Sequence, residues 1–399
     1  MKYIVVLGDG MSDEPVEALN GKTPLECAVT PVMDELAAKG EIGMVQNVPA
    51  GMSPGSEVAN LSVMGYDPKE VFTGRSPLEA LSVGVEMEPD DIIFRCNVVT
   101  LTEEEPYPQK TILDHSSGEI STAEADELME AIRKAFTDET FQFYPGTSYR
   151  HIMIWKKGRQ SRLAPPHDHL TQVIGPWLPE EPVLREFMER SYEILNNHPL
   201  NLARAAQGKN KANSLWYWGA GTKPSLDGFQ AKTGLKGAMI SAVDLLKGIA
   251  VGSGMTVYNV PGATGSIDTN WEGKAQAAID ALLKDGHDFA YIHVEAPDEM
   301  AHQGLTEEKV KSIEYLDSRI IAPVVKAMED AGEDYRLLLL PDHPNLLRLR
   351  THTPDPVPYV FFDSTRQQKK LARYGETEAK ATGIFEPEGH KLMERFLSR

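Results

Sequence analysis

Three aspartates of this chain each follow an apolar run, where reactive groups gather in an α/β protein. The run KYIVVLG leads to Asp9, FAYIHVEAP leads to Asp298, and LLLLP leads to Asp342. Runs of this length rich in Val, Ile, Leu and Tyr are typical of buried parallel strands. Since ligands of such sheets gather at the carboxyl ends of the strands, we expect the three carboxylates at one edge of a sheet.

Histidines accompany two of these aspartates. His343 adjoins Asp342, His302 follows Asp298 by four residues, and His352 stands in THTPDP. If a helix follows the strand, Asp298 and His302 share one face and can bind the same ion. Each histidine alone could equally be structural. The joint set of carboxylate and imidazole suits Zn²⁺ or Mn²⁺ better than Mg²⁺ alone or a thiolate site.

The segment GMSPGSEVANLSVMGYDP supplies a candidate nucleophile, Ser56, close to an expected helix start. N–H groups at the start of a helix favour an alkoxide or a phosphate. An ordinary N-cap serine would give the same pattern. Because a serine hydroxyl is a very weak acid, it needs a metal or a base to become a nucleophile. The aspartates and histidines make metal activation the expectation.

The segments that must position these residues alternate between strand-like and helix-like patterns. A helix is expected over Pro31–Lys39. From Asn213 onward, strand-plus-helix units follow as SLWYWG, GAMISA with VDLLKGIAVGS, and MTVYNV with a helix over Gly273–Lys284. This alternation predicts an α/β core with a mostly parallel central sheet.

The middle of the chain has a different pattern. Short strands are expected at Ile92–Leu101, Thr140–Tyr144 and Tyr149–Trp155, around one helix at Ser121–Ala135 that begins with the start signal S-T-A-E. A chain of 399 residues is long enough for two cores. We therefore expect a smaller inserted α+β domain at residues 87–180, between two parts of the core at 1–86 and 181–399.

Charge and composition restrict the partners. A net charge of -19 argues against nucleic acid and anionic membranes, which bind broad basic faces, so any anionic substrate must be met locally. Two cysteines, Cys27 and Cys96, make no disulfide framework, and the start MKYIVVLGDG lacks the features of a signal peptide. No stretch approaches the roughly 20 apolar residues of a membrane span. These features predict a cytoplasmic enzyme.

A set of short motifs runs from Met1 to the C-terminal helix. They are DG near the start, GSEVAN, TGRSPLEA, FRCNVVTL, SYRH, PPHD, PGATG, HVEAPDEMAH, PDH and HTPDPVP. Their combination resembles the cofactor-independent phosphoglycerate mutases of the alkaline phosphatase superfamily. It is more similar still to the archaeal-type branch, and within that to a bacterial subgroup proposed to be homoserine kinases.

The resemblance implies an alkaline-phosphatase-like core with a dinuclear metal centre. Mn²⁺ is the expected metal, with Zn²⁺, Mg²⁺ and Co²⁺ as alternatives. Ser56 would be phosphorylated in turnover. The implied ligands of one ion are Asp9, Ser56, Asp342 and His343, and those of the other are Asp298, His302 and His352. One departure concerns the pocket, because well-characterised bacterial mutases carry NSEVGH where this chain has GSEVAN, with Asn60 in place of the histidine.

The same resemblance suggests residues that grip a small anionic phosphorylated substrate. Arg95, Arg150 and His151 stand in FRCN and SYRH, and Lys247 stands in DLLKG. Arginine binds phosphate or carboxylate through paired N–H bonds, and lysine acts as a point charge. Lys247 is also a candidate catalytic residue, and Asp168 in PPHD is a candidate acid or base. Each of these residues alone is as often structural.

The expected activity is the interconversion of 3-phosphoglycerate and 2-phosphoglycerate through phospho-Ser56. A homoserine kinase-like phosphotransferase would use the same serine and metals with different acceptor contacts. A phosphatase or phosphodiesterase would let water resolve the phosphoserine. The remaining alternative is a metal-binding protein without catalysis. Neither a Walker A sequence nor a kinase signature set is present, which weakens the kinase hypothesis. The oligomeric state is left open.

Overall fold

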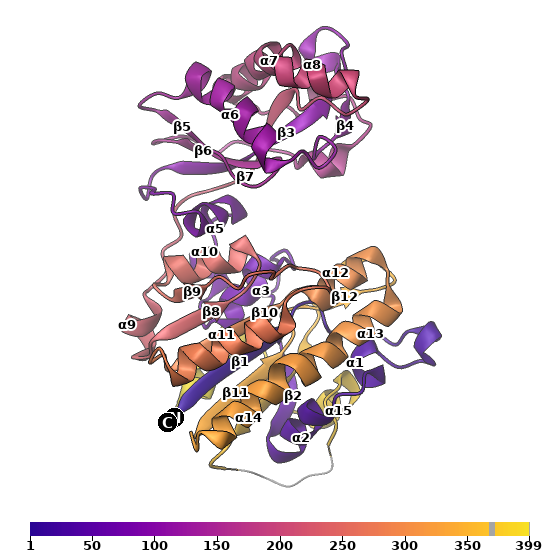
Figure 1. Cartoon of the computed structure of the whole chain (residues 1–399), viewed down its shortest axis with the longest axis vertical. Helices are drawn as coiled ribbons and strands as arrows, with labels where there is room; N and C mark the ends of the chain where they lie inside the picture. Colours follow the sequence, from indigo (N-terminus) through magenta and orange to yellow (C-terminus); the bar gives the residue numbers. More distant parts are fainter. Residues whose placement is uncertain (367–371, 399) are drawn as a thin grey trace. The chain divides into compact units, whose positions relative to one another are not determined.

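The computed structural model describes residues 1–366 and 372–398, which form two compact units (Figure 1). The core unit comprises Met1–Phe72 and Ser225–Arg399, and the inserted unit comprises Thr73–Pro224. Each unit has its own sheet and its own hydrophobic cluster. Among the described residues, no helix is both long and apolar enough to cross a membrane.

The core unit is built on an eight-stranded sheet in the order β15-β2-β14-β11-β1-β10-β8-β9. Its strands are β1 (Lys2–Gly8), β2 (Glu41–Val45), β8 (Gly237–Ile240), β9 (Thr256–Tyr258), β10 (Phe289–Val294), β11 (Tyr335–Leu340), β14 (Val357–Asp363) and β15 (Phe385–Glu386). The central strand β1 pairs in parallel with β10 and β11, whereas β14 is antiparallel to both of its neighbours. The prediction of a mostly parallel sheet is therefore confirmed.

Both faces of this sheet are covered, which is why its strands are apolar along their whole length. On one face, Ile4 and Val6 of β1 belong to a cluster that includes Leu36 of α2 and Ala278 of α11. On the other face, the Tyr3 ring lies edge-on to Phe396 of α16. The helices of the core unit are α1 (Pro24–Cys27), α2 (Pro31–Lys39), α3 (Ser56–Val63), α4 (Pro68–Val71), α9 (Phe229–Thr233), α10 (Asp244–Gly252), α11 (Trp271–Leu283), α12 (Ala296–Gln303), α13 (Thr306–Tyr315), α14 (Ala322–Asp330), α15 (Glu376–Ala381) and α16 (Gly389–Leu397), with a π-helical turn, η5 (Leu316–Ile321), between α13 and α14.

The inserted unit combines an antiparallel sheet with helices, as expected for an α+β domain. Its strands are β3 (Ile92–Leu101), β4 (Ile112–Asp114), β5 (Phe141–Tyr144), β6 (Arg150–Trp155) and β7 (Ser214–Gly221). Its helices are α5 (Arg75–Ser82), α6 (Thr122–Phe136), α7 (Pro182–Asn196) and α8 (Pro199–Ala206). Helix α6 begins with a capping box between Ser121 and Glu124, as the S-T-A-E signal predicted.

The inserted unit is longer at both ends than the predicted 87–180, since it runs from Thr73 to Pro224. The segment SLWYWG, which we had expected to be a core strand, forms β7 and pairs antiparallel with β3. Trp216 is buried in the same cluster as Phe94 and Leu184, so α7 and β7 complete the interior of this unit. A strand pattern in the sequence does not say which sheet the strand joins, and here the strand joins β3 of the inserted unit.

Candidate metal centre

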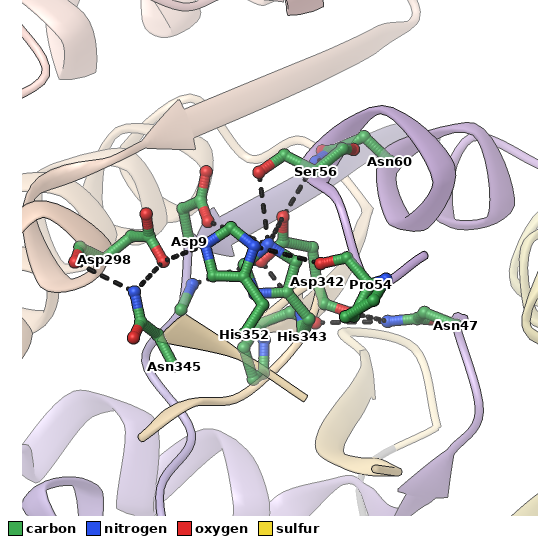
Figure 2. A network of polar contacts seen from close by, with 12 residues as sticks. Asp9, Asn47, Pro54, Ser56, Asn60, Asp298, Asp342, His343, Asn345 and His352 are labelled. Atoms are coloured by element: carbon green, nitrogen blue, oxygen red, sulfur yellow. Dashed lines mark hydrogen bonds and ion pairs between the residues drawn. The ribbon is translucent and has the colours of Figure 1, made fainter. Parts of the chain in front are cut away.

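The ends of neighbouring strands bring the three predicted aspartates together in the core unit (Figure 2). Asp9 directly follows β1, Asp342 stands two residues after β11, and Asp298 lies in the first turn of α12, which follows β10. All three carboxylates are buried. The parallel pairing of β1 with both neighbours is what places them at one edge of the sheet.

One group of candidate ligand atoms surrounds His343. Ligand atoms of Asp9, Asp342 and His343 all lie within 4.8 Å of one another. The Nε2 atom of His343 is 3.3 Å from Asp342 Oδ2 and 3.7 Å from Asp9 Oδ1. Ser56, the first residue of α3, places its hydroxyl oxygen 3.1 Å from the same nitrogen. The predicted nucleophile therefore adjoins the first predicted ligand set.

A second group is centred on Asp298. Its Oδ2 lies 3.1 Å from His302 Nε2, its Oδ1 lies 3.2 Å from His352 Nε2, and the two Nε2 atoms are 2.9 Å apart. Helix α12 places Asp298 and His302 on one face, as their spacing predicted. Ligand atoms of Asp298, His343 and His352 also lie within 4.8 Å of one another, so His343 stands between the two groups.

The hydrogen bonds of two histidines show which nitrogen of each ring faces the group. The Nδ1 atom of His302 is 2.9 Å from the Arg350 carbonyl, and that of His352 is 3.0 Å from the Pro54 carbonyl. Because a carbonyl can only accept, each Nδ1 carries the proton, and a neutral ring presents a lone pair at Nε2. Two lone pairs 2.9 Å apart beside a carboxylate are the arrangement that a shared cation stabilises.

The charges of the site also favour a cation. Burial, and then the charges of Asp342 and Asp298, raise the pKa of Asp9 well above its usual value. The Oδ1 atom of Asp9 is buried and has no hydrogen-bond partner within the described part of the chain. When protonated, His302 and His352 donate from Nε2 to Asp298, which lowers the pKa of Asp298 despite its burial and raises the pKa of His302 to about 9. A bound metal cation would take the place of these protons. Crowded buried carboxylates with an orphaned oxygen fit divalent metal ions.

Two residues that the sequence analysis missed orient these carboxylates. His293 of β10 is fully buried, and its Nε2 lies 2.9 Å from Asp9 Oδ2 while its Nδ1 lies 3.1 Å from the Ser241 hydroxyl. Burial lowers the pKa of His293 to about 3, so the ring that contacts Asp9 is neutral. Asn345 donates to Asp298 Oδ1 at 2.7 Å. The histidine inside the apolar run FAYIHV was the available signal for the first of these contacts.

Arg95, one of the predicted substrate-binding residues, lies in the inserted unit and is buried. Its guanidinium is 3.0 Å from Glu79 and 4.8 Å from the centre of the Trp218 ring, and its Nε has no hydrogen-bond partner in the described part of the chain. Arg75 bonds the same Glu79 oxygen at 2.8 Å. Glu79 thus bonds both guanidinium groups. Glu79, Arg75 and Trp218 were not predicted from the sequence.

Arg150 and His151 begin β6, opposite Asn97 and Cys96 of β3. Arg150 is exposed and lies over the Tyr149 ring. His151 is 1% exposed, and burial lowers its pKa to about 3, so its ring is neutral. Its Nδ1 accepts from the Gly146 N–H at 3.1 Å. These contacts suit Arg150 to an anion better than they suit His151.

The two remaining predicted catalytic residues, Asp168 and Lys247, lie in different units. Asp168 stands on a short 3-10 helix, Pro166–His169, of the inserted unit, with its side chain 60% exposed and 3.7 Å from His167 Nε2. Lys247 lies on α10 of the core unit, with its Nζ 3.6 Å from Asp244. The metal-ligand candidates and Lys247 therefore belong to the core unit. Arg95, Arg150, His151 and Asp168 belong to the inserted unit.

An α/β core that gathers carboxylates, imidazoles and a helix-terminal serine at its strand ends defines a candidate metalloenzyme of phosphoryl transfer. A sequence profile described as 2,3-bisphosphoglycerate-independent phosphoglycerate mutase matches residues 37–201. A Geobacter sulfurreducens protein named "Probable 2,3-bisphosphoglycerate-independent phosphoglycerate mutase" is 50% identical, with 100% of both chains covered. The chain therefore belongs to the 2,3-bisphosphoglycerate-independent phosphoglycerate mutase family, as its motifs indicated.

Two solved structures agree with this assignment at the level of the fold. A protein from Pyrococcus horikoshii superposes with a TM-score of 0.83 at 30% identity, with 99% of this chain and 96% of that chain covered. The cofactor-independent phosphoglycerate mutase from Thermoplasma acidophilum gives a TM-score of 0.67 at 24% identity, with 100% of both chains covered. The resemblance therefore extends over the core unit and the inserted unit together.

Proposed function

We propose that the protein interconverts 3-phosphoglycerate and 2-phosphoglycerate through a phosphoserine at Ser56. The family supplies the reaction class. The observation that carries the proposal is the 3.1 Å distance between the Ser56 hydroxyl and His343, the residue common to both candidate metal groups. A nucleophile in this position can reach a phosphoryl group bound at the same centre.

In this mechanism, Ser56 Oγ attacks the phosphorus of the bound phosphoglycerate and the bond between phosphorus and the substrate oxygen breaks. Attack on phospho-Ser56 by the other hydroxyl of glycerate returns the phosphoryl group and frees the serine. Two divalent ions, for which we propose Mn²⁺, would favour the serine alkoxide and neutralise the phosphoryl oxygens. One ion would be held by Asp9, Ser56, Asp342 and His343, and the other by Asp298, His302 and His352.

We assign the grip on the substrate to the inserted unit. Arg95 and Arg150 would bind the anionic groups of glycerate through charge-assisted N–H bonds, which are stronger than neutral ones. Asp168, exposed on its 3-10 helix, would carry protons to and from the substrate hydroxyls. Lys247 of α10 would add a point charge from the core unit. His151, whose ring is neutral, would contribute a hydrogen bond to the substrate and no charge.

The test is phosphorus NMR of the Mn²⁺-loaded protein with 3-phosphoglycerate, without added bisphosphoglycerate or ATP. We expect the signal of 2-phosphoglycerate to appear, and Ser56→Ala to abolish it while the fold persists, because the change removes one reacting oxygen at a helix start. Ser62→Ala, on the same helix, is the matched control and should keep activity. Release of inorganic phosphate would instead establish a phosphatase, and ATP-dependent phosphorylation of homoserine would establish the kinase alternative.

A further inference from the structure

Asn60, which replaces the histidine of the bacterial motif, connects the nucleophile to a candidate metal ligand. It lies one turn after Ser56 in α3 and is fully buried. Its Nδ2 donates to Asp342 Oδ2 at 3.0 Å (Figure 2) and to the Ser56 carbonyl at 2.9 Å. Its Oδ1 accepts from the Tyr291 hydroxyl at 2.7 Å. Both ends of the amide are thus in use.

The Tyr291 contact determines which way this amide points. Burial raises the pKa of Tyr291 well above its usual value, so the phenol keeps its proton and donates to Oδ1. The NH₂ group must then face Ser56 and Asp342. Without the phenol, the amide could turn over and set its oxygen against the Asp342 carboxylate, where two acceptors repel each other.

Asn60 acts on the oxygen of Asp342 that faces the site. The Oδ1 atom accepts from the backbone N–H groups of Gly10 at 3.1 Å and of His343 at 2.9 Å. The Oδ2 atom accepts from Asn60 and lies 3.3 Å from His343 Nε2, within the first group of ligand atoms. Backbone N–H groups therefore fix the position of Asp342 Oδ1, whereas the position of Oδ2 depends on the Asn60 side chain, which a substitution can remove.

We propose that Asn60 is a positioning residue that keeps the Ser56 turn and the Asp342 carboxylate in a fixed relation, with Tyr291 orienting its amide. This inference rests on the proposed function, in which Ser56 and Asp342 serve one ion. It predicts that loss of Asn60 weakens metal binding and lowers kcat, while KM changes little because Asn60 contacts no substrate in this scheme. Groups that orient ligands typically change metal affinity by about tenfold to a hundredfold.

The test is a Mn²⁺ titration of the metal-free full chain without substrate, in which electron paramagnetic resonance measures the binding. We expect Asn60→Ala to weaken Mn²⁺ binding by about tenfold or more at one of the two sites, the one that Asp342 serves. Tyr291→Phe should cause a smaller loss in the same site. The double variant should bind no more weakly than Asn60→Ala alone, since both changes act through one amide.

Two matched variants separate positioning from packing. Asn201→Ala removes a fully buried amide that bonds two backbone carbonyls of the inserted unit, and Tyr217→Phe removes a buried hydroxyl without a hydrogen-bond partner among the described residues. Both should leave Mn²⁺ affinity unchanged. If Asn60→Ala and Tyr291→Phe bind Mn²⁺ like these controls, the inference is wrong, and if Asn60→Ala fails to fold, Tyr291→Phe alone decides. Weakened Mn²⁺ binding in a protein without mutase activity would refute the proposed function and leave the inference standing.

Discussion

The nitrogen that each histidine presents is the property on which the candidate centre depends. The carbonyls of Arg350 and Pro54 hold the Nδ1 protons of His302 and His352, so both rings aim Nε2 at Asp298. Neither carbonyl can be recognised from the sequence, because each contact joins segments far apart in the chain. A histidine motif alone therefore predicts a ligand but not the atom that binds.

The predicted role of His302 as a metal ligand can be tested by metal content. Metal-reconstituted protein should contain about two divalent ions per chain, one for each ligand group. His302→Ala should lose one of them, because Asp298 and His352 alone leave that ion too few donors. Elemental analysis after gel filtration measures the content. The matched control is His198→Ala, at the start of α8 in the inserted unit, which should keep both ions. Unchanged metal content in His302→Ala would remove this residue from the ligand set.

At the scale of elements, helix α2 depends on a group that lies far along the chain. Its N-cap residue, Thr30, makes no capping hydrogen bond. Instead, Asp317 of the π-helical turn η5 accepts from the backbone N–H of Met33 at 2.7 Å and of Val32 at 3.4 Å. The start of α2 was predictable from Pro31, whereas its cap was not, because no local pattern links residues 284 positions apart.

Asp317 provides the prediction for this element. Burial raises the pKa of its carboxyl to about 6, so the folded state holds the proton more tightly than the unfolded chain does. The stabilisation from Asp317 is therefore fully present below the unfolded pKa and is lost as pH rises through about 6. Urea unfolding should show the stability of the wild type falling relative to Asp317→Asn between pH 4 and pH 7.

Asp317→Ala supplies the control for the cap itself. It removes both acceptor oxygens, so it should cost about 1 kcal/mol of unfolding free energy at low pH, where Asp317→Asn costs less. If the difference in unfolding free energy between wild type and Asp317→Asn stays constant with pH, the folded and unfolded states bind the Asp317 proton equally.

For the whole molecule, the division into two units predicts that metal binding and substrate binding can be impaired separately. All the metal-ligand candidates lie in the core unit, and Arg95 lies in the inserted unit. Arg95→Gln should raise KM for 3-phosphoglycerate by about tenfold or more, since a hydrogen bond to a charged group contributes about 1.5–3 kcal/mol. Calorimetric titration should find unchanged Mn²⁺ binding in this variant.

The matched control is Arg204→Gln, which breaks the ion pair of another buried arginine of the inserted unit with the partly exposed Glu124, at 2.8 Å. It should lower the melting temperature and leave KM unchanged. An equal rise of KM in both variants would show that Arg95 acts through the stability of the unit.

Which parts of this structure the sequence predicts depends on how far apart along the chain the interacting residues lie. Asp9 and Asp342 were predictable, because an apolar run and the rule for parallel sheets are enough to place a residue at a strand end. His293 was not, because its contact with Asp9 exists only through the pairing of β10 with β1, where His293 stands opposite Leu7. The partner of β7 was missed for the same reason.

The central place of β1 has a consequence for synthesis on the ribosome. Tyr3 pairs with Phe289 on one side and with Arg336 on the other, so the first strand to be made has no partner until most of the chain exists. At a synthesis rate of about 5–20 residues per second, β1 stays unpaired while the whole inserted unit is made. The inserted unit takes its strands from one continuous stretch and can fold meanwhile. Nascent chains that stop before β10 would present an unpaired β1, which makes them natural clients of chaperones.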